Sequence, residues 1–168
     1  MYEHWQVARW ETPVSNAVSL AMVSLIDEGQ LSIILQDLKN LRRRRFKFAF
    51  TRYPAYRNIP EEYRTELWEH VAETRKALGW TFTVTNSDWV ISLRQNEPML
   101  DVNHPHLTHY VIGTEDDVIE ILSPEAPSIQ EVRSRLLPSN IGKSRILHHP
   151  HDHEEIKKVI QKTKHRHK

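Results

Sequence analysis

The chain has 168 residues, of which 39% are apolar, enough for one domain with extensions around a single core. It contains no cysteine, which excludes disulfides, thiol catalysis and cysteine-ligated zinc. The formal net charge of +1 hides a segregated distribution, because residues 42–59 hold seven basic side chains and no acid, whereas both flanking segments are acidic.

Residues 1–41 predict an N-terminal arm followed by a helical hairpin. The first thirteen residues show no clear period. Beyond them, the apolar residues of 14–42 recur at helical spacing on both sides of Gly29. A hairpin that packs on a sheet is favoured over a DNA-binding helix-turn-helix, since the second helix offers few polar side chains for base edges. The apolar run Val14 to Ile26 is too short to span a bilayer, so we expect no membrane partner.

The stretch 42–57 reads RRRRFKFAFTRYPAYR and contains a strand from Phe46 to Thr51. Strand side chains alternate between faces, so Phe46, Phe48 and Phe50 share one face and the basic side chains occupy the other. The aromatic face requires a core, and the cationic face requires an anionic partner.

A helix is predicted from Pro60 to Leu78, because proline suits the first helical position and Gly79 suits the end. Trp80 to Thr85 alternates aromatic or aliphatic residues with threonines and predicts a second strand. A strand–helix–strand order over about forty residues is typical of a right-handed crossover between parallel strands.

Two further strands, Leu107 to Ile112 and Asp117 to Leu122, predict an antiparallel hairpin. Trp89 to Leu93 predicts a short strand, and Gln95 to His104 a loop.

The last elements follow the hairpin. Ser128 with Glu131 forms a capping box and predicts a short helix that ends at Pro138. We expect residues 139–168 to form an extended basic tail. The domain organisation is therefore an arm and helical hairpin at 1–41, an α/β domain at 42–138 and the tail.

Two basic segments are candidates for contact with the phosphates of a nucleic acid. Four consecutive arginines with no neighbouring acid are uncommon as a purely solubilising block. The candidate residues are Arg42, Arg43, Arg44, Arg45, Lys47, Arg52 and Arg57, with Lys157, Lys158, Lys162, Lys164, Arg166 and Lys168 as a weaker second strip.

Histidines cluster in two places and offer an alternative function, because imidazole is a common zinc ligand. The metal-ligand candidates are His104, His106, His109, His149, His151 and His153. We favour surface histidines over a metal site, since strand alternation would send His106 and His109 to different faces.

No enzyme is expected. The sequence has no metallo-hydrolase histidine signature, no Gly-rich phosphate loop and only four glycines, and no Ser/His/Asp set can be nominated. We therefore expect neither a cofactor nor a small-molecule substrate.

Several short stretches resemble one known family. They are SLIDEGQL at 24–31, GWTFTV at 79–84, PHLTHYVIG at 105–113 and SIQEV at 128–132. Together with the element order, they resemble the cysteine-poor thioredoxin-like family. That family is shared by certain mitochondrial ribosomal proteins and a small accessory subunit of respiratory complex I.

The resemblance implies an α/β fold with a thioredoxin-like mixed sheet, made of a parallel β-α-β unit and an antiparallel hairpin. It implies a structural protein of the mitochondrial ribosome, in the small subunit, located in the mitochondrial matrix. Its partners would be ribosomal RNA and neighbouring ribosomal proteins. An accessory subunit of complex I is the alternative, and the extra N- and C-terminal segments suit the ribosomal protein better.

Overall fold

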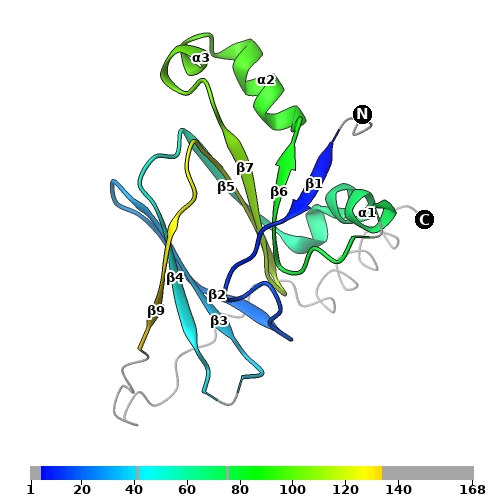
Figure 1. Cartoon of the computed structure of the whole chain (residues 1–168), viewed down its shortest axis with the longest axis vertical. Coiled ribbons are helices and arrows are strands. Elements are labelled where there is room, and N and C mark those ends of the chain that lie inside the picture. The colour runs from blue at the N-terminus through cyan, green and yellow to red at the C-terminus, as the bar shows by residue number, and fades with distance from the viewer. Residues whose placement is uncertain (1–4, 41, 75, 134–168) are drawn as a thin grey trace, which may run out of the picture. The chain divides into compact units, whose positions relative to one another are not determined.

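The structure is a computed structural model that describes residues 5–40, 42–74 and 76–133. The chain divides into two units, Met1–Ser134 and Arg135–Lys168, and all described residues belong to the first. They form two antiparallel sheets with three helices and one short 3-10 helix (Figure 1). The elements are β1 Gln6–Arg9, β2 Leu20–Asp27, β3 Leu31–Asp37, β4 Arg45–Phe50, β5 Ala55–Pro60, η1 Glu61–Tyr63, α1 Thr65–Glu73, β6 Thr81–Thr85, α2 Asp88–Asn96, α3 Met99–Asn103, β7 Thr108–Gly113, β8 Asp117–Ser123 and β9 Ser128–Val132.

The predicted thioredoxin-like fold is wrong. One sheet has five strands in the order β1-β6-β7-β8-β5, and the other has four in the order β2-β3-β4-β9. Every pairing between these strands is antiparallel. The strands predicted as parallel neighbours, β4 and β6, lie in different sheets, so no β-α-β crossover joins them.

The predicted N-terminal helical hairpin is also wrong, because β2 and β3 form a β-hairpin that turns at Gly29, whose φ is +74°. The pairing register shifts between Met22 and Ser24, so the inward positions of β2 are Leu20, Met22 and Leu25. This β-bulge breaks the alternation of two and replaces it with a three-residue step that imitates helical spacing. The boundary predicted at 41/42 falls in the turn between β3 and β4, so strands from both sides of it share one sheet.

Two other predicted elements have the opposite type. The predicted strand at Trp89 to Leu93 lies inside helix α2, and the segment headed by Ser128 is strand β9 instead of a helix. Burial against existing neighbours overrides local propensity in β9, where Ile129 lies opposite Phe48 of β4.

Several local predictions are confirmed. The aromatic strand is β4, the threonine-rich strand is β6, and β7 and β8 form the predicted hairpin. The helix predicted from Pro60 is present in a shorter form, as η1 followed by α1.

The main core lies between the two sheets. Phe46, Phe48 and Phe50 point from the four-stranded sheet toward Tyr110 and Ile112 of the five-stranded sheet, and all five are buried. Burying a large side chain of this kind stabilises the folded state by roughly 1.5–3 kcal/mol. The aromatic face of β4 therefore has the core that its sequence requires.

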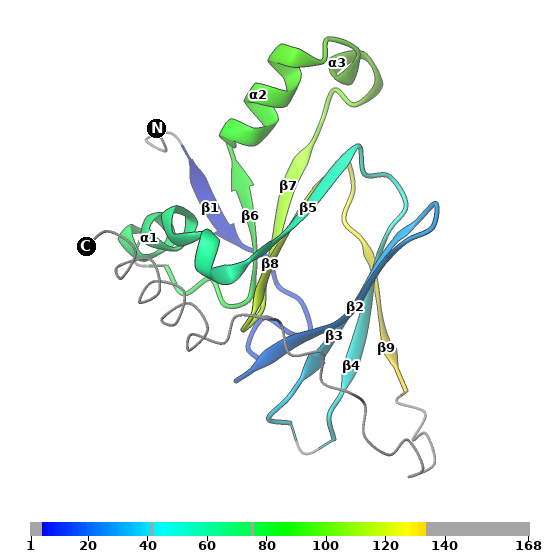
Figure 2. The same ribbon diagram turned by 180° about the vertical axis from the view of Figure 1, so that it is seen from behind.

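A second core lies on the opposite face of the five-stranded sheet. Leu67 of α1 packs there against Phe82, Val111 and Val118. Figure 2 shows α1 beside β1 and β6, while α2 and α3 project past the ends of β6 and β7. This helix-side face carries the buried polar residues discussed below.

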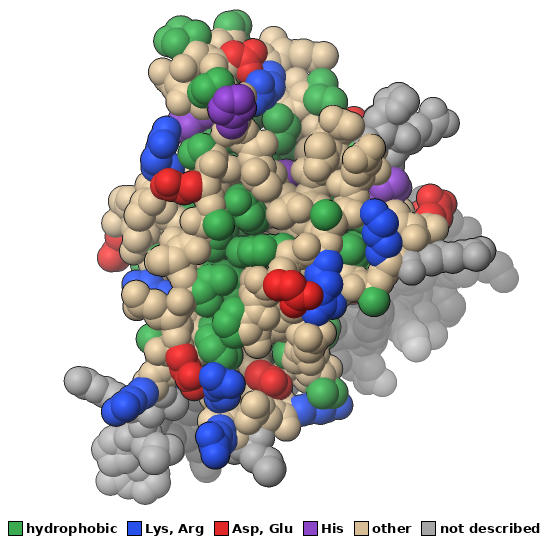
Figure 3. Space-filling view, in the orientation of Figure 1, with side chains coloured by type: hydrophobic (Ala, Val, Ile, Leu, Met, Phe, Trp, Pro, Cys, Tyr) green, Lys and Arg blue, Asp and Glu red, His purple; other side chains and the backbone are tan. Residues whose placement is uncertain are grey.

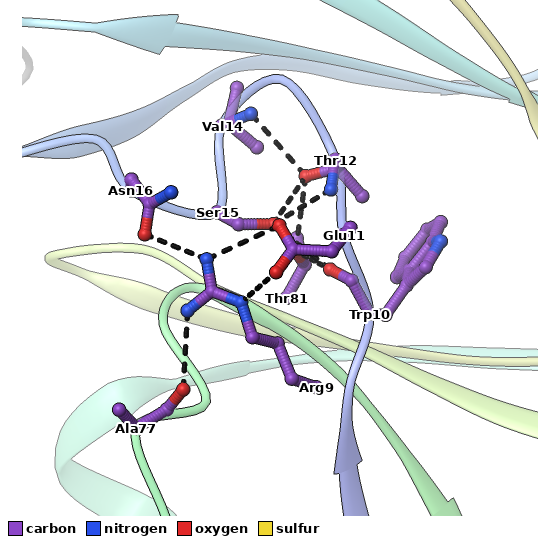
Figure 4. A network of polar contacts seen from close by, with 9 residues as sticks. All are labelled: Arg9, Trp10, Glu11, Thr12, Val14, Ser15, Asn16, Ala77 and Thr81. Carbon is purple, nitrogen blue, oxygen red and sulfur yellow. Dashed lines mark hydrogen bonds and ion pairs between the residues drawn. The ribbon is translucent and has the colours of Figure 1, made fainter.

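The chain passes from β1 to β2 through a segment held by polar contacts (Figure 4). Arg9 donates to the carbonyl of Ala77 at 3.1 Å and to Oδ1 of Asn16 at 2.7 Å. The Oγ of Ser15 lies 2.7 Å from Oγ1 of Thr81. These bonds fix the connection against the loop that precedes β6. Among the described residues, no helix has the length and apolar character needed to cross a bilayer.

Candidate functional site

The turn between β3 and β4 presents exposed cations on an ordered backbone. Oδ1 of Asp37 accepts the backbone N–H groups of Lys39 and Asn40, both at 3.2 Å. The side chain of Asn40 accepts the N–H of Arg42 at 3.0 Å. Arg43 adopts a φ of +43° to close the turn, and Lys39, Arg42 and Arg43 are exposed. The turn thus presents three cations from a fixed loop.

Arg44 and Arg45 are partly engaged within the chain. Arg44 forms a bidentate ion pair with Glu131 of β9, at 2.9 and 2.7 Å. The hydrogen bond from Arg44 lowers the pKa of Glu131, and the charges of Arg42 and Arg133 lower it further. Nε of Arg45 donates to Oε1 of Gln36 at 2.9 Å. Glu131 is therefore a single carboxylate surrounded by arginines.

The outward face of the four-stranded sheet carries further positive charge next to the turn. Arg45 and Lys47 point outward because Phe46, which lies between them, and Phe48, which follows, point inward. Their cross-strand neighbours on β3 and β9 are uncharged: Gln36, Ile34, Gln130 and Val132. Figure 3 shows lysine and arginine side chains, interspersed with acidic ones, at the lower end of the molecule, over the β3–β4 turn and the ends of β4 and β9. We call this surface the basic end; it consists of Lys39, Arg42, Arg43, Arg44, Arg45, Lys47 and Arg133.

Other predicted phosphate contacts lie elsewhere. Arg52 follows β4 at the end opposite to Arg45, and Arg57 lies on β5 in the five-stranded sheet. The predicted second strip, Lys157, Lys158, Lys162, Lys164, Arg166 and Lys168, falls outside the described residues. Arg52 and Arg57 therefore lie away from the surface that Arg42 to Arg45 and Lys47 share, and phosphate contact by these two residues stays a prediction.

Arg57 belongs to a buried ionic cluster on the helix-side face of the five-stranded sheet. Glu120 of β8 has no exposed surface, and its carboxylate accepts from Nε of Arg57 and, at 2.6 Å, from Nη2 of Arg64. The guanidinium of Arg57 also lies over the ring of Trp89, 4.3 Å from its centroid. Burial by itself raises the pKa of Glu120, but the hydrogen bond and the charge of Arg57 outweigh it, and the pKa of Glu120 is lowered. The cluster thus holds an ionised carboxylate between two arginines.

His109 extends this cluster toward α2. Its Nδ1 lies 2.8 Å from Oγ of Ser87, and its Nε2 lies 3.8 Å from Oε1 of Glu120. Burial lowers the pKa of His109 to about 4, and the nearby arginines also lower it, although the charge of Glu120 opposes them. The imidazole is therefore neutral at pH 7. The negative oxygen near Nε2 favours a proton on that atom, so that Nδ1 accepts the serine hydroxyl.

This arrangement contains a serine, a histidine and a carboxylate, which is the composition of a hydrolytic triad. Its geometry does not suit that chemistry. The histidine and the carboxylate are too far apart for a hydrogen bond, and both oxygens of Glu120 are already engaged by arginines. Ser87 is only 2% exposed. We assign the cluster to fixing β5, β8 and the loop before α1 to one another.

The three described histidines of the first cluster do not assemble a metal site. His109 is buried beside Ser87, whereas His106 is exposed. Among the described residues, no group of three or more histidine, aspartate or glutamate side chains is placed to hold a metal ion. His149, His151 and His153 fall outside these residues.

Sequence reasoning misses the buried ionic cluster. Glu120 interrupts the apolar run of β8, and an acid in such a run is the one indication that a buried partner exists. Its partners follow from strand register, which places Arg57 directly opposite Glu120. No local pattern reveals that register.

Comparison with protein-family models finds no match, and searches of curated proteins and of solved structures also find none.

Proposed function

We propose that this protein binds nucleic acid through the basic end of the four-stranded sheet. The observation that carries the proposal is the charge of this surface. Seven lysine and arginine side chains gather around two carboxylates, Asp37 and Glu131. Asp37 caps the turn and Glu131 pairs with Arg44, so the other cations of the basic end form no ion pair with a carboxylate among the described residues.

This surface suits contacts with phosphates because it is basic and because a sheet holds its side chains in place. Arg45 and Lys47 are two residues apart on β4, which separates their Cα atoms by about 7 Å along the strand. The ordered turn adds Lys39, Arg42 and Arg43 beyond the end of the strand. A row of cations on a rigid support can follow a phosphate backbone without a large entropic cost of ordering.

Among the described residues, the basic end offers no aromatic platform on which bases could stack. The three phenylalanines of β4 are at most 4% exposed, because they form the core. Proteins that bind single strands use aromatic platforms for successive bases, and bidentate contacts with base edges confer specificity. We therefore expect binding that depends strongly on salt and weakly on base sequence.

The ribosomal, mitochondrial and complex I expectations rest on the family resemblance alone. They stay predictions, and the antiparallel fold adds no support to them. Nucleic-acid contact is a separate expectation, since it rests on the basic residues themselves.

The test is a titration of the full chain with labelled duplex and single-stranded RNA at several salt concentrations between about 50 and 200 mM. The variant Arg42→Ala, Arg43→Ala, Lys47→Ala should bind more weakly, with a slope of log K against log salt smaller by about 2 to 3. Arg52→Ala removes a cation outside the basic end and is the matched control. An unchanged slope in the triple variant, or an equal loss per charge in the control, contradicts the proposal.

A further inference from the structure

A pocket at the end of the five-stranded sheet combines two tryptophans with carboxylates. It has a volume of about 400 Å³ and is lined by Glu61, Trp68, Trp80, Thr114 and Glu115. These residues come from η1, from α1, from the residue before β6 and from the β7–β8 turn. The pocket therefore depends on the tertiary fold, and the basic end contributes nothing to it.

The two indoles converge on the backbone of Gly113. A Cβ added at this glycine would lie 2.9 Å from Cη2 of Trp68 and 3.6 Å from Cε3 of Trp80. The six-membered rings of both tryptophans thus contact the same point at the end of β7. A larger residue there would push the Trp68 ring away, so glycine permits the arrangement.

Each ring is also fixed by a contact of its own. Nε1 of Trp80 donates to the carbonyl of Ala17 at 2.7 Å. Trp68 packs edge-on against Phe82, with ring centroids 6.2 Å apart. The aromatic walls are therefore positioned before any ligand arrives. Nε1 of Trp68 is buried and has no acceptor among the described residues.

The charge at this pocket is negative. Its two glutamates are joined by Asp116 and Asp117 of the same turn, and the N–H of Glu61 donates to the carbonyl of Asp116 at 2.9 Å. None of these four carboxylates forms an ion pair with a lysine or arginine among the described residues. Burial raises the pKa of Asp117, and the charge of Asp116 raises it further, as expected where acids crowd together.

Indole rings that line a pocket beside carboxylates without a cationic partner favour one class of ligand. A cation over an indole face is attracted by the ring quadrupole, and this is the usual recognition of quaternary and methylated ammonium groups. A small hydrated metal ion would gain little from indole walls, because its preferred ligands are oxygens. We propose that the pocket of Glu61, Trp68, Trp80, Thr114 and Glu115 binds an alkylated ammonium group.

Such a group occurs in free molecules of the choline type and in methylated lysine side chains. The shared chemistry is a trimethylammonium head, and the volume of the pocket suits a ligand of this size. This inference is independent of nucleic-acid binding, so either proposal can fail alone.

The experiment titrates the full chain with choline and with 3,3-dimethylbutan-1-ol, in which carbon replaces the charged nitrogen. Calorimetry and tryptophan fluorescence are the measurements. Choline should bind more tightly by a factor of about 3 to 30, which corresponds to one cation–π contact of ordinary strength. A second arm compares a trimethyl-lysine peptide with its unmodified form and distinguishes a free ligand from a methylated chain; binding in either arm supports the site.

The double variant Glu61→Gln, Glu115→Gln keeps the shape of the pocket and removes the charge of the two carboxylates that line it. It should weaken choline binding at least several-fold with an unchanged melting temperature. Glu69→Gln on the exposed side of α1 is the matched control and should bind as the parent does. Equal binding of choline and its uncharged isostere, no binding of any ammonium ligand, or full binding by the double variant overturns the proposal.

Discussion

Nη2 of Arg64 lies 2.6 Å from Oε1 of Glu120, a carboxylate that has no exposed surface. Arg64 is the residue immediately before α1, and Glu120 lies at the centre of β8. The ion pair therefore ties the first helix to the middle of the five-stranded sheet. Arg57 completes the neutralisation from the adjacent strand.

Replacing Glu120 with glutamine should destabilise the protein strongly. The substitution leaves two arginines beside an apolar face without a counter-charge, and breaking a buried pair in this way costs about 3 to 5 kcal/mol. Denaturant unfolding followed by circular dichroism measures the change. Glu73→Gln, an exposed position on α1, is the matched control and should unfold as the parent does. Equal stability of the two variants would show that the cluster is not a structural anchor.

The stability should depend on pH through His109. Its pKa is about 4 in the folded protein, because burial disfavours the charged form, against an ordinary value of 6.5. Between these values the unfolded chain binds more protons than the folded one, so the free energy of unfolding rises with pH. It should fall by up to about 1.4 kcal/mol per pH unit as the pH drops through this window.

His109→Gln identifies the group responsible for this pH dependence. Glutamine does not titrate, so the variant should show a flatter dependence of unfolding free energy on pH between about 4 and 6.5. Parallel curves for the variant and the parent would assign the effect to other groups.

Two glycines with similar backbone angles should respond very differently to alanine. Gly79 has a φ of +69°, and a Cβ there would lie 2.2 Å from the carbonyl oxygen of Ser15. Gly29 has a φ of +74° and open space around it. Gly29→Ala should lower the free energy of unfolding by about 1 to 2 kcal/mol, because alanine is strained in the left-handed backbone region. Gly79→Ala should cost at least about 2 kcal/mol more, because the Ser15 backbone must move. Thermal unfolding compares the two, and equal losses would contradict the close approach of the 10–17 segment.

Removing an acid from the basic end should strengthen nucleic-acid binding. Glu131→Gln releases Arg44 from its bidentate pair, so that one more cation can contact a phosphate. The slope of log K against log salt should become steeper by about 0.9. Both members of the pair are about half exposed, so the melting temperature should change little. Weaker binding would instead show that Arg44 requires Glu131 to hold its position.

Elements with a strict local alternation could be predicted from the sequence. The three phenylalanines of β4 and the threonine-rich strand β6 each repeat with period two, and both are strands. The hairpin of β7 and β8 is also marked by a turn between apolar runs. In β4 and β6 the alternation follows the burial of one face, whereas β7 and β8 are buried on both faces and were recognisable as continuous apolar runs.

The remaining elements could not be predicted because non-local contacts determine them. The bulge at Met22 gives β2 a helix-like spacing. Ser128 and Glu131 have the spacing of a capping box, yet Glu131 pairs with Arg44 and the segment completes a sheet. Trp89 favours a strand by propensity, but the chain turns into α2 immediately before it.

The candidate surfaces divide in the same way. Arg42 to Arg45 were visible as a basic run, whereas Lys39 and Arg133 join them only through the turn and the β4–β9 pairing. The pocket of Trp68 and Trp80 draws on four separate segments, and no spacing in the sequence relates them.

The two neighbours of β4 in its sheet are β3 and β9. In the chain, β9 follows β4 only after β5, β6, β7 and β8, which all belong to the other sheet. During synthesis, one edge of the phenylalanine-rich strand β4 therefore keeps its backbone amides and carbonyls unpaired until β9 has been made. An open edge of this kind is a template for pairing with a second chain. A product that stops short of Ser128 should consequently self-associate, and the few residues of β9 guard the protein against aggregation.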